Sequence, residues 1–97
     1  MTGRYTLSPR AQGDLDEIWT YTETRWGIEQ AEFYTHQIEH DIRTIAAQPN
    51  MSRACSDIRA GYWKYPTGSH VLFYRPIIGG IDVVRILHER MDPARHF

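Results

Sequence analysis

The chain has 97 residues, of which 41% are hydrophobic, so we expect residues 1–97 to fold around one small core as a single domain. Its one cysteine, Cys55, excludes an intramolecular disulfide, and no apolar run approaches the roughly 20 residues of a membrane-spanning helix, so we expect a cytoplasmic protein. The net charge of −1 conceals eight acids against four arginines in residues 1–50, and seven basic residues against four acids in residues 51–97.

Two amphipathic helices are predicted in the first half. Residues 4–7 form a short extended segment, and Ser8 and Pro9 after it are typical of a helix N-cap and a first helical position. Apolar residues then recur at helical spacing in two stripes, separated by Gly27. The first stripe comprises Ala11, Leu15, Ile18, Trp19 and Trp26 with Tyr21 at its edge, and the second comprises Ala31, Tyr34, Ile38, Ile42 and Ile45. The tight joint predicts an antiparallel helical hairpin that ends before Pro49.

Strands are predicted in the second half. Residues 62–65, 70–75 and 81–88 are rich in aromatic and β-branched side chains. Turn-forming residues separate them at 66–69 and 76–80, which predicts an antiparallel meander. The helical stripes need an apolar surface to cover, and one face of this sheet provides it. We therefore expect an α+β fold with an N-terminal helical hairpin packed on a small antiparallel β-sheet.

Three short motifs contain residue types found in metal sites or as nucleophiles, but none has the neighbouring residues that such a site requires. His36, Glu39 and His40 match the H-x-x-E-H pattern of inverted zinc peptidases. The two histidines lie beside or outside the buried stripe and no third ligand is evident, so we expect an exposed helix face, with no metal and no other cofactor. Cys55 and Ser69 lack the neighbours of a nucleophile, and they are interpreted as loop and turn residues.

Arginines and histidines on the C-terminal strands form the remaining candidate site. The set is Arg75, Arg85, His88, Arg90, Arg95 and His96. Regular alternation places Val83 and Leu87 on the face of Arg85, and Ile86 on the face of His88. The set can therefore converge only beyond the end of the strand. Such a basic surface favours an acidic or phosphate-bearing partner. The alternative is a structural network that ties the tail to the sheet through Asp57, Asp82 or Asp92.

Several short segments, taken in order, resemble the ParE-type toxins of the RelE/ParE toxin–antitoxin superfamily. These segments are Leu7-Ser8-Pro9, Asp14-Leu15, Glu17-Ile18-Trp19, Trp26-Gly27, Pro49, Asp57-Ile58-Arg59, Gly61, Gly68-Ser69-His70, Phe73-Tyr74-Arg75, Val84-Arg85-Ile86-Leu87-His88 and Arg90-Met91-Asp92. The resemblance covers nearly the whole chain. It implies a bacterial, non-enzymatic toxin that binds DNA gyrase and is neutralised by a ParD-like antitoxin whose C-terminal segment wraps around it.

Two sets of residues are expected to serve these partners. The target-binding set is Arg85, His88, Arg90, Met91, Asp92, His96 and Phe97. The antitoxin-binding set is Arg59, Trp63, Tyr65 and Arg75, because a sheet edge and exposed aromatic side chains invite strand or helix addition.

A messenger ribonuclease that acts on the ribosome, as in RelE-type relatives, is the alternative function. In this comparison Arg90 falls where those relatives keep a catalytic arginine, and His96 falls near their C-terminal tyrosine. Val71, however, falls where they keep a second arginine. A chain without that arginine has lost a cation that would stabilise the phosphorane. A binding toxin is therefore preferred. A plain nucleic-acid-binding module, with Trp63, Tyr65 and Tyr74 as stacking platforms, is the least favoured because the helices need the apolar residues around these aromatic side chains for a core.

Overall fold

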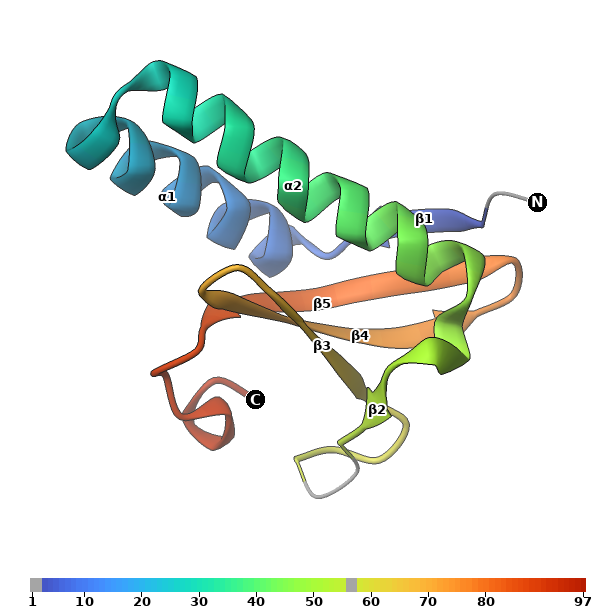
Figure 1. Ribbon diagram of the computed structural model, residues 1–97. Coiled ribbons are helices and arrows are strands. Elements are labelled where there is room, and N and C mark those ends of the chain that lie inside the picture. The colour runs from blue at the N-terminus through green and yellow to red at the C-terminus, as the bar shows by residue number, and fades with distance from the viewer. Residues whose placement is uncertain (1–2, 56–57) are drawn as a thin grey trace.

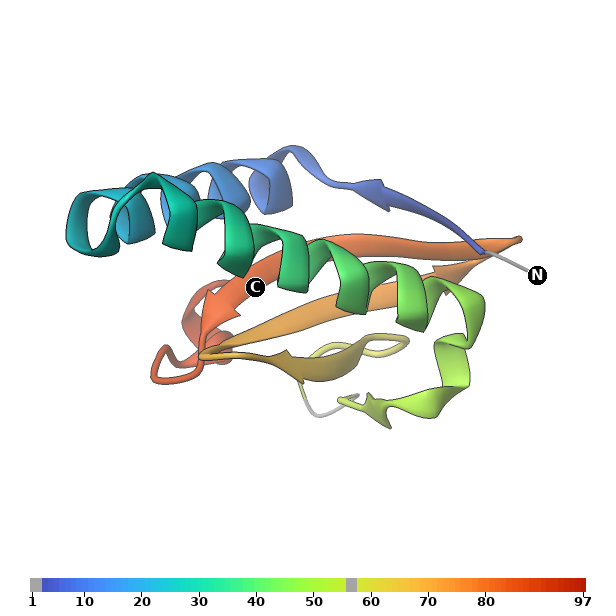
Figure 2. The ribbon, with the colours of Figure 1, turned by 45° about the horizontal axis from the view of Figure 1, so that its top comes forward.

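The computed structural model describes residues 3–55 and 58–97, and it shows a helical hairpin lying across one face of a β-sheet (Figures 1 and 2). The elements are β1 (Arg4–Leu7), α1 (Pro9–Trp26), α2 (Ile28–Ala47), β2 (Arg53–Ala54), β3 (Trp63–Thr67), β4 (His70–Ile77) and β5 (Gly80–His88), with 3-10 helices at Pro49–Met51 and Pro93–Arg95. The predicted α+β class and the hairpin over a sheet are confirmed. Within the described ranges, no helix is both long and apolar enough to cross a bilayer.

The sheet corrects the expected antiparallel meander in two respects. Its five strands lie in the order β1-β5-β4-β3-β2. β1 pairs in parallel with β5, from Arg4 opposite Gly80 to Leu7 opposite Val83, so the sheet is mixed. The two-residue β2 extends the other side by pairing with β3. Neither edge strand is long enough to show a periodic pattern, and pairing between segments so far apart depends on the fold rather than on local sequence.

The main core lies between the hairpin and the sheet. Ser8 begins α1 as predicted, with its Oγ accepting the N–H of Ala11 at 3.0 Å. The buried cluster comprises Ala11, Ile18, Ile38, Ile42, Ile45, Ala46, Leu72, Tyr74, Ile81, Val83 and Ile86. Trp26 was expected on the buried stripe, but its side chain is 67% exposed. The joint between the helices extends past the sheet in Figure 1, so the last turn of α1 has no strand beneath it.

A β-bulge reverses the face pattern of β5 half way along the strand. The register against β4 shifts by one residue, which leaves Val84 without a partner. Val83 and Ile86 consequently both join the core under the helices, whereas Leu87 belongs to a second cluster on the other face. The prediction that Leu87 shares a face with Val83 is therefore wrong, because regular alternation cannot anticipate a bulge.

The sheet face that the helices leave open carries this second cluster. Cys55, Phe73 and Leu87 are buried in it. The ring of Phe97 packs edge-on against Phe73 and Tyr62, with centroids 5.2 and 5.5 Å apart. The C-terminal tail thus folds back beneath the sheet instead of extending away from it (Figure 1).

Candidate interaction site

Where β1 ends, the first turns of α1 and its N-cap form the hydrogen bonds along the outer edge of β5. Ser8 donates its N–H to the carbonyl of Val83 at 2.9 Å and its hydroxyl to the carbonyl of Val84 at 2.7 Å. Asp14 accepts the N–H of Ile86 at 2.9 Å. Because these groups satisfy an edge that would otherwise lack partners, they fix the helix on the strand.

Arg85 is held in a buried pair with Asp14. Its Nε and Nη2 donate to Asp14 Oδ2 and Oδ1 at 2.8 and 2.9 Å, and each side chain is only 13% exposed. Its Nη1 donates to the carbonyl of His96 at 3.3 Å. Hydrogen bonding to Asp14 raises the pKa of Arg85 above its ordinary value, so the guanidinium stays charged. The side chain expected to contact a target is thus largely occupied within the protein.

The arginine network considered from the sequence exists, but its main partner was not anticipated. This partner is Asp14 on α1. The pattern of side chains along one strand does not predict a contact with a residue so far away in the sequence. Two of the expected acids are used elsewhere: Asp82 pairs with Arg75 at 3.2 Å, and Asp92 lies 4.0 Å from Arg95. Both of these pairs are exposed and contribute little to stability. Asp57 lies outside the described residues.

Hydrogen bonds and one ring contact connect α2 with the ends of β4 and β5. The hydroxyl of Tyr34 accepts the N–H of Ser69 at 2.9 Å and lies 2.6 Å from Nδ1 of His70. The phenol can donate its proton to Nδ1 when neutral His70 carries its own ring proton on Nε2. The ring of His70 meets that of His88 edge-on at 5.3 Å. Nδ1 of His88 in turn accepts the N–H of Arg90 at 3.1 Å.

This partly buried His70 is expected to make stability depend on pH. Burial first, and then the charge of His88, lower the pKa of His70 below its ordinary value of 6.5, although Glu89 and Asp14 act in the opposite direction. As the pH falls, His70 therefore becomes protonated in the unfolded chain before it does so in the folded protein. Its contribution to the free energy of unfolding is complete above pH 6.5 and is lost as the pH falls below that value. We expect the melting temperature to decrease between about pH 7.5 and about pH 5.5.

His70→Asn is the matched control for this pH dependence. The Asn Oδ1 lies near the position of Nδ1 and accepts the Tyr34 proton, but it does not titrate in this range. The variant should lose less stability than the wild type over the same pH interval. Equal losses in the two proteins would assign the effect to other groups.

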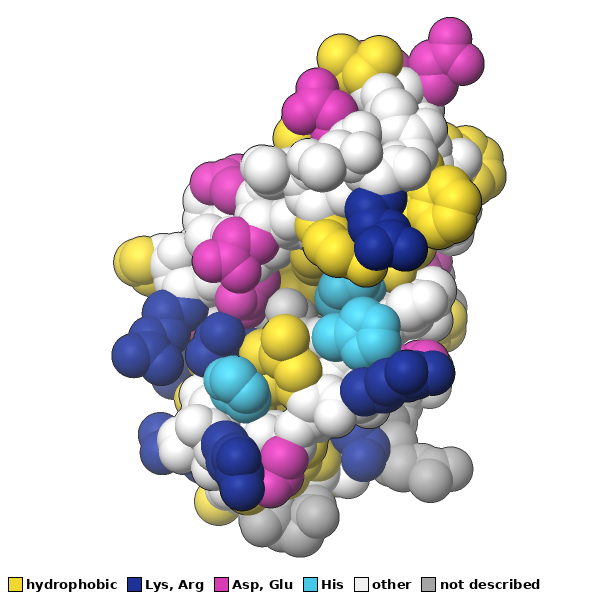
Figure 3. Space-filling model, turned by 90° about the vertical axis from the view of Figure 1, so that its left-hand side faces the viewer, with side chains coloured by type: hydrophobic (Ala, Val, Ile, Leu, Met, Phe, Trp, Pro, Cys, Tyr) yellow, Lys and Arg dark blue, Asp and Glu magenta, His cyan; other side chains and the backbone are white. Residues whose placement is uncertain are grey.

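Two adjoining hollows lie between the end of the hairpin and the ends of β4 and β5. They share Tyr21, Thr22, His70 and His88 as lining residues. One, of about 480 Å³, also reaches Asp14, Glu17, Ile18, Arg85, Ile86, Leu87, Met91 and His96, and the other, of about 560 Å³, also reaches Trp26, Gln30, Tyr34 and Ser69. We call the two together the histidine groove. On this side of the molecule, histidine side chains lie between hydrophobic and basic ones (Figure 3).

The target-binding residues expected from the sequence are only partly brought together. Arg85, His88, Met91 and His96 line the histidine groove. Arg90 and Met91 are exposed on the turn that follows β5. Asp92 instead caps the last 3-10 helix by accepting the N–H of Ala94 at 3.1 Å, and Phe97 packs under the sheet. The tail is therefore a folded segment anchored at both ends, which displays Arg90 and Met91.

The antitoxin-binding residues expected from the sequence lie on or near β3 and β4. Trp63 and Tyr65 are half-buried against the main core, whereas Arg59 and Arg75 are exposed. β2 pairs only with the first two residues of β3, so the remainder of that outer edge has no neighbouring strand among the described residues. A hollow of about 660 Å³ beside this edge is lined by Met51, Ser52, Lys64, Tyr65, Pro66 and Val71.

A second apolar surface at the end of the hairpin was missed from the sequence. Its members are Tyr21, Trp26, Ile28 and Phe33, exposed by between 56 and 67%, and we call them the hairpin-end patch. All four lie at or within a few residues of the joint between the helices, and large exposed apolar side chains are typical of interaction surfaces. The sequence offers no clear signal for this surface, because helical periodicity does not report where the strands beneath a helix end.

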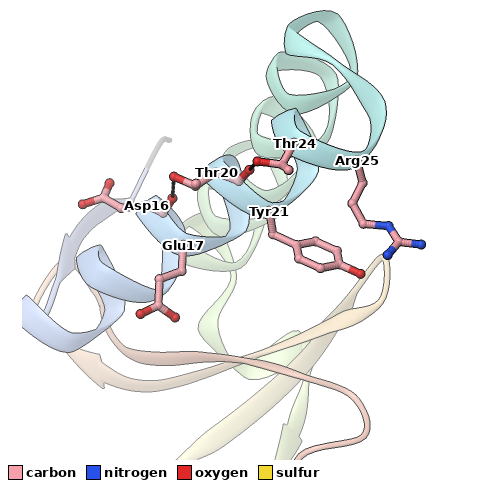
Figure 4. Close-up of a pocket in the computed structure, with 6 residues that line it drawn as sticks. All are labelled: Asp16, Glu17, Thr20, Tyr21, Thr24 and Arg25. Atoms are coloured by element: carbon pink, nitrogen blue, oxygen red, sulfur yellow. Dashed lines mark hydrogen bonds between the residues drawn. The ribbon is translucent and has the colours of Figure 1, made fainter.

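A shallow depression on the outer face of α1 lacks the arrangement of a catalytic site (Figure 4). It has a volume of about 480 Å³ and is lined by Asp16, Glu17, Thr20, Tyr21, Thr24 and Arg25. The hydroxyls of Thr20 and Thr24 donate back to helix carbonyls at 3.1 and 2.8 Å. The carboxylates of Asp16 and Glu17 point away from Arg25 (Figure 4). Because its polar groups are used locally or diverge, we interpret the depression as ordinary helix surface.

The zinc-peptidase pattern on α2 has the placement expected from the sequence. His36 and His40 are both exposed, with Ile38 buried between them. In residues 3–55 and 58–97, no three His, Cys, Asp or Glu side chains gather closely enough to hold a metal ion. Nothing in the arrangement of this helix face connects it with the histidine groove.

Comparisons of the sequence and of the fold with known proteins all find toxins or toxin–antitoxin systems. A family model described as the ParE toxin of a type II toxin-antitoxin system, parDE, matches residues 5–93. The chain is 54% identical to Toxin ParE1 of Mycobacterium tuberculosis, with 99% of both chains covered, and 45% identical to Toxin ParE1 of Caulobacter vibrioides, with 95% of both covered. A solved structure described as the chromosomal ParDE TA system from P. aeruginosa has a TM-score of 0.76 at 17% identity, covering 89% of this chain and 95% of that one. The structural likeness concerns the fold alone.

Proposed function

The chain belongs to the ParE toxin family of type II toxin–antitoxin systems, and we propose that it stops bacterial growth by binding DNA gyrase through its C-terminal tail. The observation that supports this proposal is the display of Arg90 and Met91, exposed on an anchored turn beside the histidine groove. Binding energy at interfaces concentrates in a few anchors, among which arginine is frequent. Arg90 and Met91 are the proposed anchors, with Arg85, His88, Asp92, His96 and Phe97 as the surrounding set.

We infer binding rather than catalysis because Arg85, His70 and His88 already have partners, which leaves Arg90 and His96 as the candidates for catalysis near the tail. A ribonuclease needs an acid, a base and a cation that are free to act on the phosphate. Arg85 is committed to Asp14, and Nδ1 of His88 accepts a backbone N–H. Nδ1 of His70 is hydrogen-bonded to the side-chain hydroxyl of Tyr34. His96, which lines the groove, is the residue on which the ribonuclease alternative depends.

A ParD-like antitoxin is proposed to cover two surfaces of this toxin. The open edge of β3, with Trp63 and Tyr65 beside it, suits the addition of an extended segment. Arg59 and Arg75 are exposed and offer charges to an acidic segment. The hairpin-end patch suits the apolar face of a helix. Both proposed partners place the toxin in the cytoplasm.

Supercoiling by purified gyrase is the test of this function. The toxin should inhibit supercoiling in a dose-dependent way, and an equimolar amount of its antitoxin should restore it. At an antitoxin concentration of about 100 times its dissociation constant, the toxin should also gain about 2.7 kcal/mol of stability, seen as a higher melting temperature. Unimpaired supercoiling at saturating toxin would reject the proposed target, and an unchanged melting temperature would reject the proposed antitoxin contact.

A further inference from the structure

Asp14 lies on α1, far in sequence from the C-terminal tail. The side chain of Arg85 connects the two, because it donates hydrogen bonds both to Asp14 and to the carbonyl of His96. We propose that Asp14, acting through Arg85, is a positioning residue for the tail and sets the placement of the surface around Arg90 and Met91. The proposal rests on the proposed function only for its consequence on gyrase. The positioning itself follows from contacts within this chain.

The carboxylate of Asp14 meets three donors on β5. Oδ2 accepts both Nε of Arg85 at 2.8 Å and the backbone N–H of Ile86 at 2.9 Å, while Oδ1 accepts Nη2 at 2.9 Å. The remaining guanidinium nitrogen, Nη1, donates to the carbonyl of His96 at 3.3 Å. A planar guanidinium can bridge two acceptors in this fixed geometry. Helix α1, strand β5 and the tail are thus joined at one point.

The tail has two attachments to the rest of the protein just after its last 3-10 helix, Pro93–Arg95. Phe97 is attached by its ring, which packs against Phe73 and Tyr62. His96 is attached by its carbonyl, through Arg85. The ring contact resists movement away from the sheet, and the carbonyl contact ties the end of the tail to β5. Arg90 and Met91 are held on one side by His88, to which their N–H groups donate at 3.1 and 2.9 Å, and on the other side by this anchored stretch, so their placement depends on both.

Removing the charge of Asp14 would leave Arg85 as an almost buried cation without its counter-ion. Such an unpaired charge is costly in the interior, so the guanidinium would turn toward water. His96 would then lose its donor, because the same side chain serves both contacts. Asp14→Asn keeps an oxygen that can accept the N–H of Ile86, which preserves the edge of the strand while weakening the hold on Arg85.

The matched control is Glu39→Gln. It makes the same change of a carboxylate to an amide in an arginine pair, but the Glu39–Arg43 pair lies 3.5 Å apart and is exposed on α2. Arg85→Lys is a second variant, which retains a charge for Asp14 but cannot bridge both acceptors. All of the proteins would first be shown to be folded by circular dichroism at the assay temperature.

Two readouts separate the positioning of the tail from its consequence. Trypsin cleavage after Arg90 and Arg95, followed by mass spectrometry, should be about tenfold faster in Asp14→Asn than in Glu39→Gln, because a released tail opens more often. Gyrase inhibition should weaken by about tenfold in the same variant. Arg85→Lys should change both readouts in the same direction.

Cleavage at the wild-type rate in folded Asp14→Asn and Arg85→Lys would overturn the proposal. Faster cleavage with unchanged gyrase inhibition would overturn the link between the tail's placement and toxicity. If the wild type leaves gyrase unaffected, the proposed function fails, and the cleavage rates alone still decide whether Asp14 positions the tail.

Discussion

Replacing Gly80 by alanine should lower the free energy of unfolding by about 3 kcal/mol, the upper end of the usual cost of overpacking. A Cβ on Gly80 would lie 1.7 Å from the carbonyl oxygen and 2.6 Å from the carbonyl carbon of Arg4. Both are backbone atoms of β1, so no side-chain rotation relieves the contact. β1 would have to move away from β5 and lose the parallel pairing that begins α1 at the correct place. Urea denaturation measures the change.

Gly13→Ala is the control with the opposite sign. Gly13 lies within α1, and an added Cβ there meets nothing within 4 Å. Alanine should therefore stabilise the protein by about 0.5–1 kcal/mol through its better helix propensity. If Gly80→Ala were as stable as Gly13→Ala, β1 would not pair with β5 in this register.

Arg90→Ala should weaken gyrase inhibition by about 30-fold, which corresponds to the loss of about 2 kcal/mol expected for a binding anchor. The side chain of Arg90 is exposed, and among the described residues its backbone N–H is the group that forms a hydrogen bond. Stability should therefore change by no more than about 0.5 kcal/mol, as for an ordinary surface substitution. Dose–response curves for supercoiling, together with melting curves, separate the two effects.

Two variants bracket this prediction. Arg90→Lys keeps the charge but not the planar donor group, so it should retain part of the inhibition. Arg43→Ala removes an exposed arginine on α2 and should leave inhibition unchanged. Similar losses in Arg43→Ala and Arg90→Ala would mean that overall charge, and not a defined anchor, determines binding.

The two helices and the three long strands were predictable because their signals are local and repeated. Ser8 and Pro9 mark the start of α1, and the stripes of both helices continue over several turns. The parallel pairing of β1 with β5, the bulge at Val84 and the exposure of Trp26 were not predictable in this way. Each depends on how far one element extends over another, which periodicity within a single element does not encode.

The sequence identified several residues of the candidate site, but not how they contact one another. The arginines and histidines near the C-terminus were identified, and four of them do occupy one end of the molecule: Arg85, His88, Arg90 and His96. The carboxylate that holds Arg85 was not, because Asp14 reaches it from a helix 71 positions away in the sequence. The histidine groove likewise needs α1, α2 and both central strands before its lining exists.

The most direct test of the central claim compares two assays on the same purified protein: gyrase supercoiling and ribosome-dependent cleavage of messenger RNA. A binding toxin should inhibit supercoiling and leave the messenger intact. His96→Ala keeps the backbone carbonyl that Arg85 contacts, and it should reduce inhibition by less than about tenfold, because most interface residues are not anchors. Messenger cleavage by the wild type that disappears in His96→Ala, with supercoiling untouched in both, would contradict the account.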